Sequence, residues 1–257
     1  MSFERYEATY EGKTRTVFRG GSGPAVIVMH EVPNLHPGVI AFGQRIVDAG
    51  FTVYMPSLFG TPGAPATPLA NLRGMARACV ATEFTVWATR TTSPITTWLR
   101  ALARDAHHAC GGPGVGAVGM CLTGGFALAM MVDDVMVAPV LSQPSLPFPI
   151  TAAHRRDLGI SDADLRIVRS RAAAGTCVLG LRFTGDPLVP DARFARLREE
   201  LGENFIAVEI DSRSKNPHRV PRVAHAVLTH NFVDAPGHPT RDALDRVLAF
   251  LSERLSN

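Results

Sequence analysis

VGAVGMCLTGGFALAMM, residues 115–131, decides the fold of this chain. An apolar run meets Gly119 and the lone Cys121, a pair of glycines follows, and apolar residues then resume. This order predicts a buried strand, a sharp bend and a helix over residues 122–132. A cysteine at such a bend is either a small core filler or a nucleophile held up to a cleft, and the rest of the sequence has to decide.

Short apolar runs alternate with helical patterns along the rest of the chain. A β-hairpin is predicted over residues 6–20, turning at Glu11–Gly12, and FGTPGAPATP, residues 59–68, is expected to be a surface loop. The predicted strands are residues 25–30, 51–57, 114–120, 135–142, 176–186, 204–211 and 225–230. The predicted helices, with Ser93 and Ser161 as N-caps of the second and fourth, are residues 39–50, 93–112, 122–132, 161–175, 190–202 and 240–255. Such alternation predicts a single-domain α/β fold over residues 1–257, with a mostly parallel, doubly wound sheet flanked by helices.

The composition narrows the class of protein. The 257 residues carry a formal net charge of +3, from 26 basic and 23 acidic side chains scattered along the chain, which does not favour a nucleic-acid partner. No apolar run is long enough for a membrane-spanning helix, and the N-terminus lacks the apolar centre of a signal peptide. Four cysteines without a pairing pattern predict free thiols in a reducing cytoplasm.

Reactive side chains stand at the ends of the predicted strands, the edge where doubly wound sheets bind ligands. Glu31 follows the first central strand, Cys121 follows residues 114–120, Asp186 ends residues 176–186, and His230 ends the last predicted strand. The chain order is therefore nucleophile candidate, acid, histidine. That is the order of the α/β-hydrolases, with a thiol in place of the hydroxyl.

Chemistry assigns a role to each member of this set. A free thiol has a pKa of about 8.5, so Cys121 needs help to ionise at neutral pH. The N-terminus of the following helix favours the thiolate, His230 is the expected base, and Asp186 would orient the imidazole. His225 would lie early in the last predicted strand, at the wrong end of the sheet. No cofactor is expected, and no metal, because the histidines and cysteine of residues 107–110 lack a second ligand cluster.

Four pieces of the sequence resemble the dienelactone hydrolase family: VIVMHEV, VGMCLTGG, TGDPLVP and THNF. The resemblance runs from about Ala25 to Leu251. It implies Cys121 as nucleophile, Asp186 as acid and His230 as base. It also implies that Glu31 touches the resting thiol and helps to take its proton. A carboxylate at the end of a buried strand needs a polar partner, which agrees with this role; the alternative is a loop glutamate that points to solvent. The oxyanion hole would be the backbone N–H groups of Leu122 and Val32.

The chain departs from the family at two points. Thr123 stands where the family usually has glycine, which implies a slightly wider bend after the nucleophile. Members that act on dienelactone bind its carboxylate with arginines, but none of the candidates here matches a family position. These candidates are Arg90, Arg213, Arg219 and Arg222. Residues 211–224 either lie near the cleft or form a solvated loop.

The resulting hypothesis is a cysteine-dependent hydrolase of an ester or an enol lactone, of the carboxymethylenebutenolidase type, acting through Cys121, His230 and Asp186. Its partner is a small-molecule substrate, and the oligomeric state is not predicted. Two alternatives stay open: a catalytically silent hydrolase-fold protein that binds a small ligand, and a thioesterase that uses the same bend.

Overall fold

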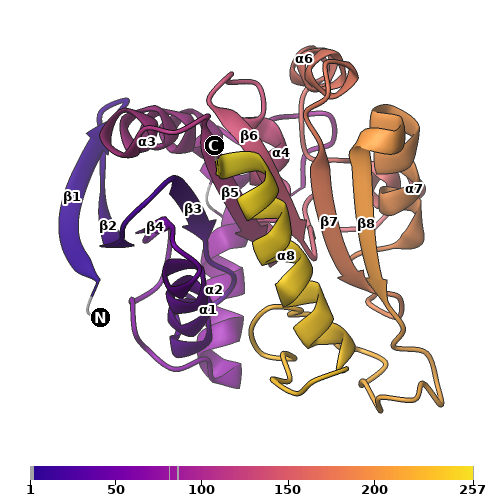
Figure 1. The fold of residues 1–257 in the computed structure, drawn as a ribbon. Helices are drawn as coiled ribbons and strands as arrows, with labels where there is room; N and C mark the ends of the chain where they lie inside the picture. Colours follow the sequence, from indigo (N-terminus) through magenta and orange to yellow (C-terminus); the bar gives the residue numbers. More distant parts are fainter. Residues whose placement is uncertain (1–2, 81, 86, 257) are drawn as a thin grey trace.

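The eight strands of the protein form one sheet, in the order β1-β2-β4-β3-β5-β6-β7-β8. The computed structural model describes residues 3–80, 82–85 and 87–256, with residues 77–80 described by their backbone alone. β1 and β2 pair antiparallel, β2 pairs antiparallel with β4, and every later pairing is parallel. The mostly parallel, doubly wound α/β sheet predicted from the sequence is confirmed (Figure 1).

The strands and helices follow one another as the alternating pattern predicts. The strands are β1 (Glu4–Tyr10), β2 (Lys13–Gly21), β3 (Ala25–Met29), β4 (Thr52–Pro56), β5 (Val115–Met120), β6 (Met136–Ser142), β7 (Val178–Phe183) and β8 (Phe205–Ile210). The α-helices are α1 (Pro37–Asp48), α2 (Pro68–Val80), α3 (Ile95–Cys110), α4 (Phe126–Met130), α5 (Ala152–Arg156), α6 (Asp162–Ala173), α7 (Asp191–Leu201) and α8 (Pro239–Leu255). Short 3-10 helices are η1 (Thr82–Phe84), η2 (Cys121–Thr123) and η3 (Gly202–Asn204).

Helices cover both faces of the sheet. One apolar cluster packs α3, α4, α6 and α7 against one face, and a second packs α1 and α8 against the other. Strands β3 and β5 are buried along their whole length and are continuous apolar runs, as expected for strands covered on both faces. The equally buried β7 carries one charged residue, Arg182. Within the described residues, no helix is long and apolar enough to cross a membrane.

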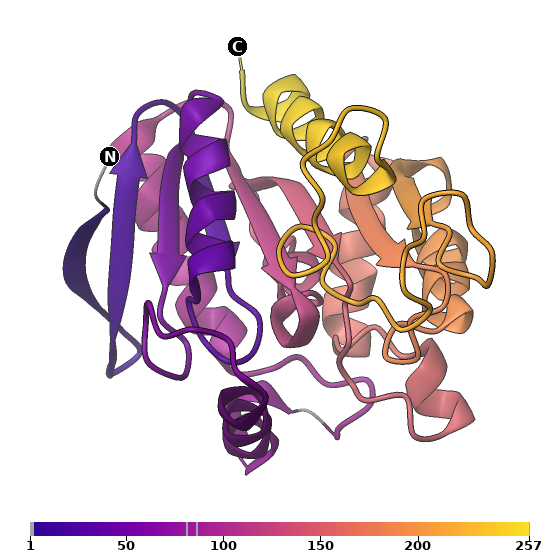
Figure 2. The ribbon, with the colours of Figure 1, turned by 90° about the horizontal axis from the view of Figure 1, so that it is seen from below.

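Local sequence signals account for most element boundaries. Glu11 and Gly12 turn the first hairpin with positive φ angles of 51° and 69°, and Pro37 opens α1. Ser161 caps α6 by accepting a hydrogen bond from the Asp164 N–H, as predicted. These features fix where the chain reverses. Figure 2 shows the same fold from below.

Four details differ from the sequence predictions. The helix expected over residues 122–132 is broken into η2 and the five-residue α4. Ser93 does not cap α3, because its hydroxyl donates to the Phe84 carbonyl instead. Helix α2 was not predicted. Residues 225–230 form turns rather than a strand, and β8 is the last strand of the sheet.

Arg193 on α7 holds the segment that follows β6 over the sheet. Its guanidinium is buried and donates to four carbonyl oxygens, those of Pro144, Pro147, Asp157 and His154, at 2.5–2.9 Å. Burial lowers the pKa of Arg193 to about 10, so the side chain stays charged at neutral pH. One side chain thereby fixes residues 144–157 beside the carboxyl end of β5.

We expect Arg193→Leu to lower the free energy of unfolding by about 3 kcal/mol or more, because it leaves buried carbonyl groups without donors. Equilibrium urea unfolding measures the loss. Arg246→Leu on α8 is the matched control, since Arg246 makes an outer ion pair with Glu253, and it should change stability by about 0.5 kcal/mol at most. Equal losses in the two variants would contradict this assignment.

Candidate active site

Cys121 sits at the sharp bend directly after β5. Its φ angle is 56°, a left-handed conformation that is uncommon for residues other than glycine. Gly119 makes the bend possible, because a Cβ atom at that position would lie 2.2 Å from the Thr123 carbonyl oxygen. Cys121 is 4% exposed, and the Ser145 hydroxyl lies 3.8 Å from its sulfur. The strain and the glycine together form the bend that the sequence predicts.

Thr123 ties this bend to the neighbouring strand. Its buried hydroxyl accepts the Met120 N–H at 2.9 Å and lies 3.0 Å from the carbonyl oxygen of Met29, the last residue of β3. The next residue, Gly124, allows the backbone to pack closely against Pro144, because a Cβ atom at this position would lie 2.5 Å from the Pro144 Cα atom. Thr123, at the position where glycine was expected, therefore adds a hydrogen-bonded link between β3 and β5.

The buried Asp186 and the half-buried His225 form a hydrogen-bonded pair beside Cys121. Asp186 follows β7, and its Oδ2 lies 2.6 Å from His225 Nδ1. Its Oδ1 accepts the Leu188 N–H at 2.9 Å, which fixes the carboxylate. The Asp186 side chain is 1% exposed. An Nδ1–H that donates to a carboxylate leaves Nε2 as the reactive nitrogen of the ring.

Asp186 pairs with His225 and not with His230, the histidine expected from the sequence. His230 is exposed, and within the described residues its side chain makes no hydrogen bond. His225 was set aside because residues 225–230 were predicted to be a strand that ends at His230. Instead Asn231 closes a turn: its side-chain oxygen accepts the N–H groups of His225 and Ala226 at 2.9 and 3.1 Å. The chain reverses at this turn, so that His225, the first residue of the segment, lies beside Asp186 instead of His230, the last.

The pKa of His225 is raised well above its ordinary value. Burial by itself lowers it, but the negative charge of Cys121 and the hydrogen bond with Asp186 outweigh burial. Nε2 is buried and has no hydrogen-bond partner of good geometry within the described residues, although Cys121 lies close enough for its charge to act on the ring. Such contacts are often loose in unliganded sites and tighten when substrate binds.

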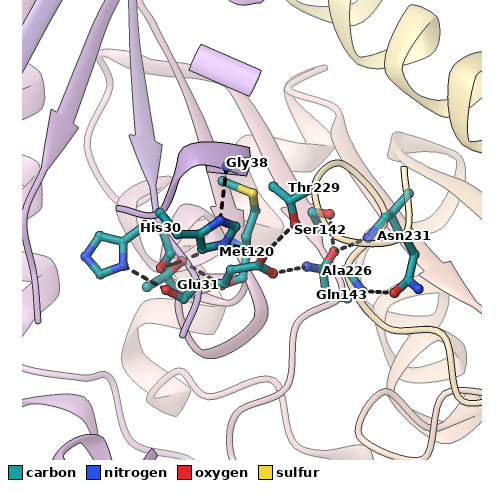
Figure 3. A network of polar contacts seen from close by, with 12 residues as sticks. His30, Glu31, Gly38, Met120, Ser142, Gln143, Ala226, Thr229 and Asn231 are labelled. Carbon is teal, nitrogen blue, oxygen red and sulfur yellow. Dashed lines mark hydrogen bonds and ion pairs between the residues drawn. The ribbon is translucent and has the colours of Figure 1, made fainter. Parts of the chain in front are cut away.

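Glu31 is buried, 4% exposed, and is not a solvent-facing loop residue. Its Oε1 accepts from His36 Nε2 at 3.1 Å and from the Thr229 hydroxyl, and its Oε2 accepts from Gln143 Nε2 at 3.0 Å. Figure 3 shows the carboxylate pointing toward the Gln143 amide. Within the described residues it makes no hydrogen bond with Cys121. The carboxylate is held instead by His36, which is near in sequence, and by Gln143 and Thr229, which are far away.

His30 has a structural role at the end of β3. It is fully buried, its Nε2 accepts the Leu58 N–H at 3.0 Å, and its Nδ1 lies 2.9 Å from the Glu31 carbonyl oxygen. Burial lowers the pKa of His30 to about 4. The ring is thus neutral at physiological pH and joins β3 to the segment after β4.

Two of the arginines considered as carboxylate ligands lie beside Asp186. Arg213 and Arg222 line a hollow of about 560 Å³ with Arg155 and Arg182. Acidic partners already pair with two of these four guanidinium groups: Arg182 with Asp191 and Glu209, and Arg213 with Asp211. Arg90 lies elsewhere, in an ion pair with Asp162. Three residues of the segment 211–224, Arg213, Ser214 and Arg222, thus line the same hollow as Asp186.

Three of the four cysteines have side chains that the structure describes. Cys110, Cys121 and Cys177 are free thiols there, and the side chain of Cys79 lies outside the described part of the chain. In the same part, no group of three or more histidine, cysteine or acidic side chains is arranged to hold a metal ion.

Proteins in which a candidate nucleophile at positive φ follows a central parallel strand, with the acid and then the histidine later in the chain, are α/β-hydrolases. The sheet of this chain, Cys121 after β5, and the later Asp186 and His225 place it in that class. The chain belongs to the dienelactone hydrolase family, since the sequence model of that family matches residues 14–253. This confirms the resemblance drawn from four short motifs.

Solved structures agree on the fold along nearly the whole chain. A putative dienelactone hydrolase from Klebsiella pneumoniae subsp. pneumoniae MGH 78578 is 16% identical, with a TM-score of 0.63 over 98% of this chain and 100% of that one. A dienelactone hydrolase-like promiscuous phosphotriesterase from metagenomic libraries is 16% identical, with a TM-score of 0.61 and 99% of each chain covered. A cold-adapted esterase from an Arctic intertidal metagenomic library is 14% identical, with a TM-score of 0.60 over 98% of this chain and 93% of that one. A search of curated proteins finds no match.

We expect Thr123→Val to lower the free energy of unfolding by about 1–3 kcal/mol, because the Met120 N–H is then buried without an acceptor. Thr123→Ser keeps the hydroxyl and should retain most of that stability. Equilibrium urea unfolding of the two variants beside the unchanged protein makes the comparison. If Thr123→Val were as stable as Thr123→Ser, the hydrogen bonds of the hydroxyl between β3 and β5 would not contribute to stability.

We expect Asp186→Asn and Cys121→Ala each to lower the pKa of His225, because each removes a negative charge that now outweighs burial. The raised pKa stabilises the folded protein below the ordinary value of about 6.5, and this stabilisation is lost as the pH rises through the folded pKa. NMR titration of the imidazole C–H resonance, assigned with His225→Gln, measures the pKa in each variant. An unchanged value in both would show that neither charge acts on the ring.

Proposed function

We propose that the protein hydrolyses an ester or an enol lactone through a triad of Cys121, His225 and Asp186. The observation that carries this proposal is the 2.6 Å contact of Asp186 with His225 Nδ1, in a ring whose pKa is raised by the charge of Cys121. A thiolate beside an imidazolium is the resting state of an activated cysteine nucleophile. The family match supports the reaction class, and the triad itself is our inference.

The thiolate of Cys121 attacks the carbonyl carbon of the substrate, and the carbonyl electron pair moves onto oxygen. When this intermediate collapses, the bond to the leaving oxygen breaks and His225 supplies its proton, leaving a thioester. Neutral His225 then takes a proton from water as the water oxygen attacks the thioester. The carbon–sulfur bond breaks, the acid leaves, and the thiolate and imidazolium form again, so one water is consumed.

The oxyanion would be held by the N–H groups of Leu122 and Val32. Leu122 lies in the single turn of η2, whose first N–H groups have no carbonyl partner within the helix. Within the described residues, the Val32 N–H donates to no protein acceptor. Two free donors on either side of the bend support this assignment.

The leaving group decides which substrates suit a thiol. A thiol is more acidic than an alcohol, so a tetrahedral intermediate formed from a simple alkyl ester expels sulfur more easily than alkoxide. An enol or aryl oxygen leaves more readily, because its conjugate acid is stronger. We therefore propose enol lactones and activated esters as the substrate class.

We expect His225→Gln to lower kcat/KM on 4-nitrophenyl acetate and on an enol lactone by about 10²–10⁴-fold, because the general base is lost. His230→Gln is the matched control and should stay within about twofold, since His230 is exposed and its side chain makes no hydrogen bond within the described residues. Steady-state kinetics on both substrates, with Cys121→Ala as the nucleophile-free reference, gives the ratio. If His230→Gln were the impaired variant, or if Cys121→Ala kept full turnover, the triad would be wrong.

The same measurements separate the alternatives. A silent ligand-binding protein would show no turnover and no covalent adduct at Cys121 with a thiol-directed probe. A thioesterase would hydrolyse acyl thioesters far faster than the two oxygen esters in parallel assays.

A further inference from the structure

We propose that Glu31 is a positioning residue that holds the turn carrying His225 against Cys121, and that it acts through Thr229 and Gln143 rather than on the thiol. The inference rests on the triad proposed above, and it assigns Glu31 a role different from the one that the family resemblance implies. The carboxylate lies at the end of β3, while the turn of residues 225–231 follows β8. A single buried side chain thus joins two distant parts of the site (Figure 3).

The carboxylate holds the turn at two points. The Thr229 hydroxyl donates directly to Glu31 Oε1. On the other oxygen, Gln143 Nε2 donates to Oε2 at 3.0 Å, and the side-chain oxygen of Gln143 accepts the Val227 N–H at 3.4 Å. These contacts fall two and four residues after His225, so they restrain the backbone that carries the ring.

The turn transmits this restraint to the histidine. Asn231 accepts the His225 N–H at 2.9 Å, and the Asn231 N–H donates to the Ala226 carbonyl oxygen at 3.0 Å. Residues 225–231 are therefore one closed unit rather than a loose loop. A shift at Thr229 moves His225 relative to Asp186 and Cys121.

The rest of the network favours a fixed carboxylate. His36 Nδ1 accepts the Gly38 N–H at 3.1 Å, so its proton lies on Nε2, which faces Glu31. Gln143 is fully buried with a positive φ of 36°, a strained conformation that persists only where surrounding contacts enforce it. Three donors converge on two buried oxygens, and removing the carboxylate would leave all three without an acceptor.

A double-mutant cycle tests the inference. The variants are Glu31→Gln, Thr229→Val and the two combined, and the readout is the second-order rate of iodoacetamide alkylation at Cys121 between pH 5 and 9. Mass spectrometry of the Cys121 peptide separates this reaction from that of the other thiols. The rate is measured at a temperature at which urea unfolding shows each variant to be folded.

We expect Thr229→Val to lower the alkylation rate near neutral pH by about 10–100-fold and to move its pH profile, because displacement of catalytic groups by about 1 Å has effects of this size. The double variant should be no slower than Glu31→Gln alone, since both changes break the same link. Thr229→Ser keeps the hydroxyl and should restore most of the rate. Thr9→Val, at an exposed hydroxyl in β1, is the control for the substitution itself.

Two results would overturn the inference. If Thr229→Val left the rate and its pH profile unchanged while Glu31→Gln lowered the rate, Glu31 would act on the thiol directly. If the two single effects multiplied in the double variant, the residues would act independently. If Glu31→Gln does not fold, the alkylation rates of Thr229→Val and Thr229→Ser still test whether the Thr229 hydroxyl positions His225. Alkylation needs no turnover, so failure here is distinguishable from failure of the proposed hydrolysis, which Cys121→Ala kinetics tests.

Discussion

The left-handed backbone at Cys121 is the constraint on which the rest of this site depends. A φ of 56° turns the sulfur out of the sheet at the carboxyl end of β5. Such a conformation costs on the order of 1–3 kcal/mol and survives only where its surroundings enforce it. Gly119 gives it room, and the Thr123 hydroxyl anchors it to β3. The chain therefore keeps a strained backbone at the residue that we propose as the nucleophile.

Around this bend, the protein replaces apolar packing with buried hydrogen bonds at the strand ends. Strands β3 and β5 are wholly apolar, but His30, Glu31, Gln143 and Asp186 at the strand ends are all at most 4% exposed. Buried polar groups are tolerated only when they are satisfied, and satisfied networks define a single arrangement. The segments after β3, β6, β7 and β8 are thus held relative to one another by directional contacts, which is what precise placement of an imidazole requires.

Much of the fold was predictable from the sequence, because it rests on local signals. Continuous β-branched runs gave the buried strands, and the glycine–cysteine–glycine order gave the bend at Cys121. The turn at residues 225–231 was missed, because a short apolar run does not distinguish a strand from a buried turn. What decides between them is the side chain of Asn231, which takes the N–H groups that a neighbouring strand would have paired. His225 was therefore passed over in favour of His230.

The partners of Glu31 were beyond the reach of sequence reasoning for a different reason. Its contacts are with residues 5, 112 and 198 positions further along the chain, so no local pattern reports them. A glutamate after a central strand is compatible with a solvent-facing loop, a contact to the thiol or a network of neutral donors. Only the third choice requires Thr229 and Gln143 to converge on it, and both belong to segments whose position is fixed by the sheet order. The contacts of Glu31 are therefore a property of the assembled strand ends, which no short motif around Glu31 reports.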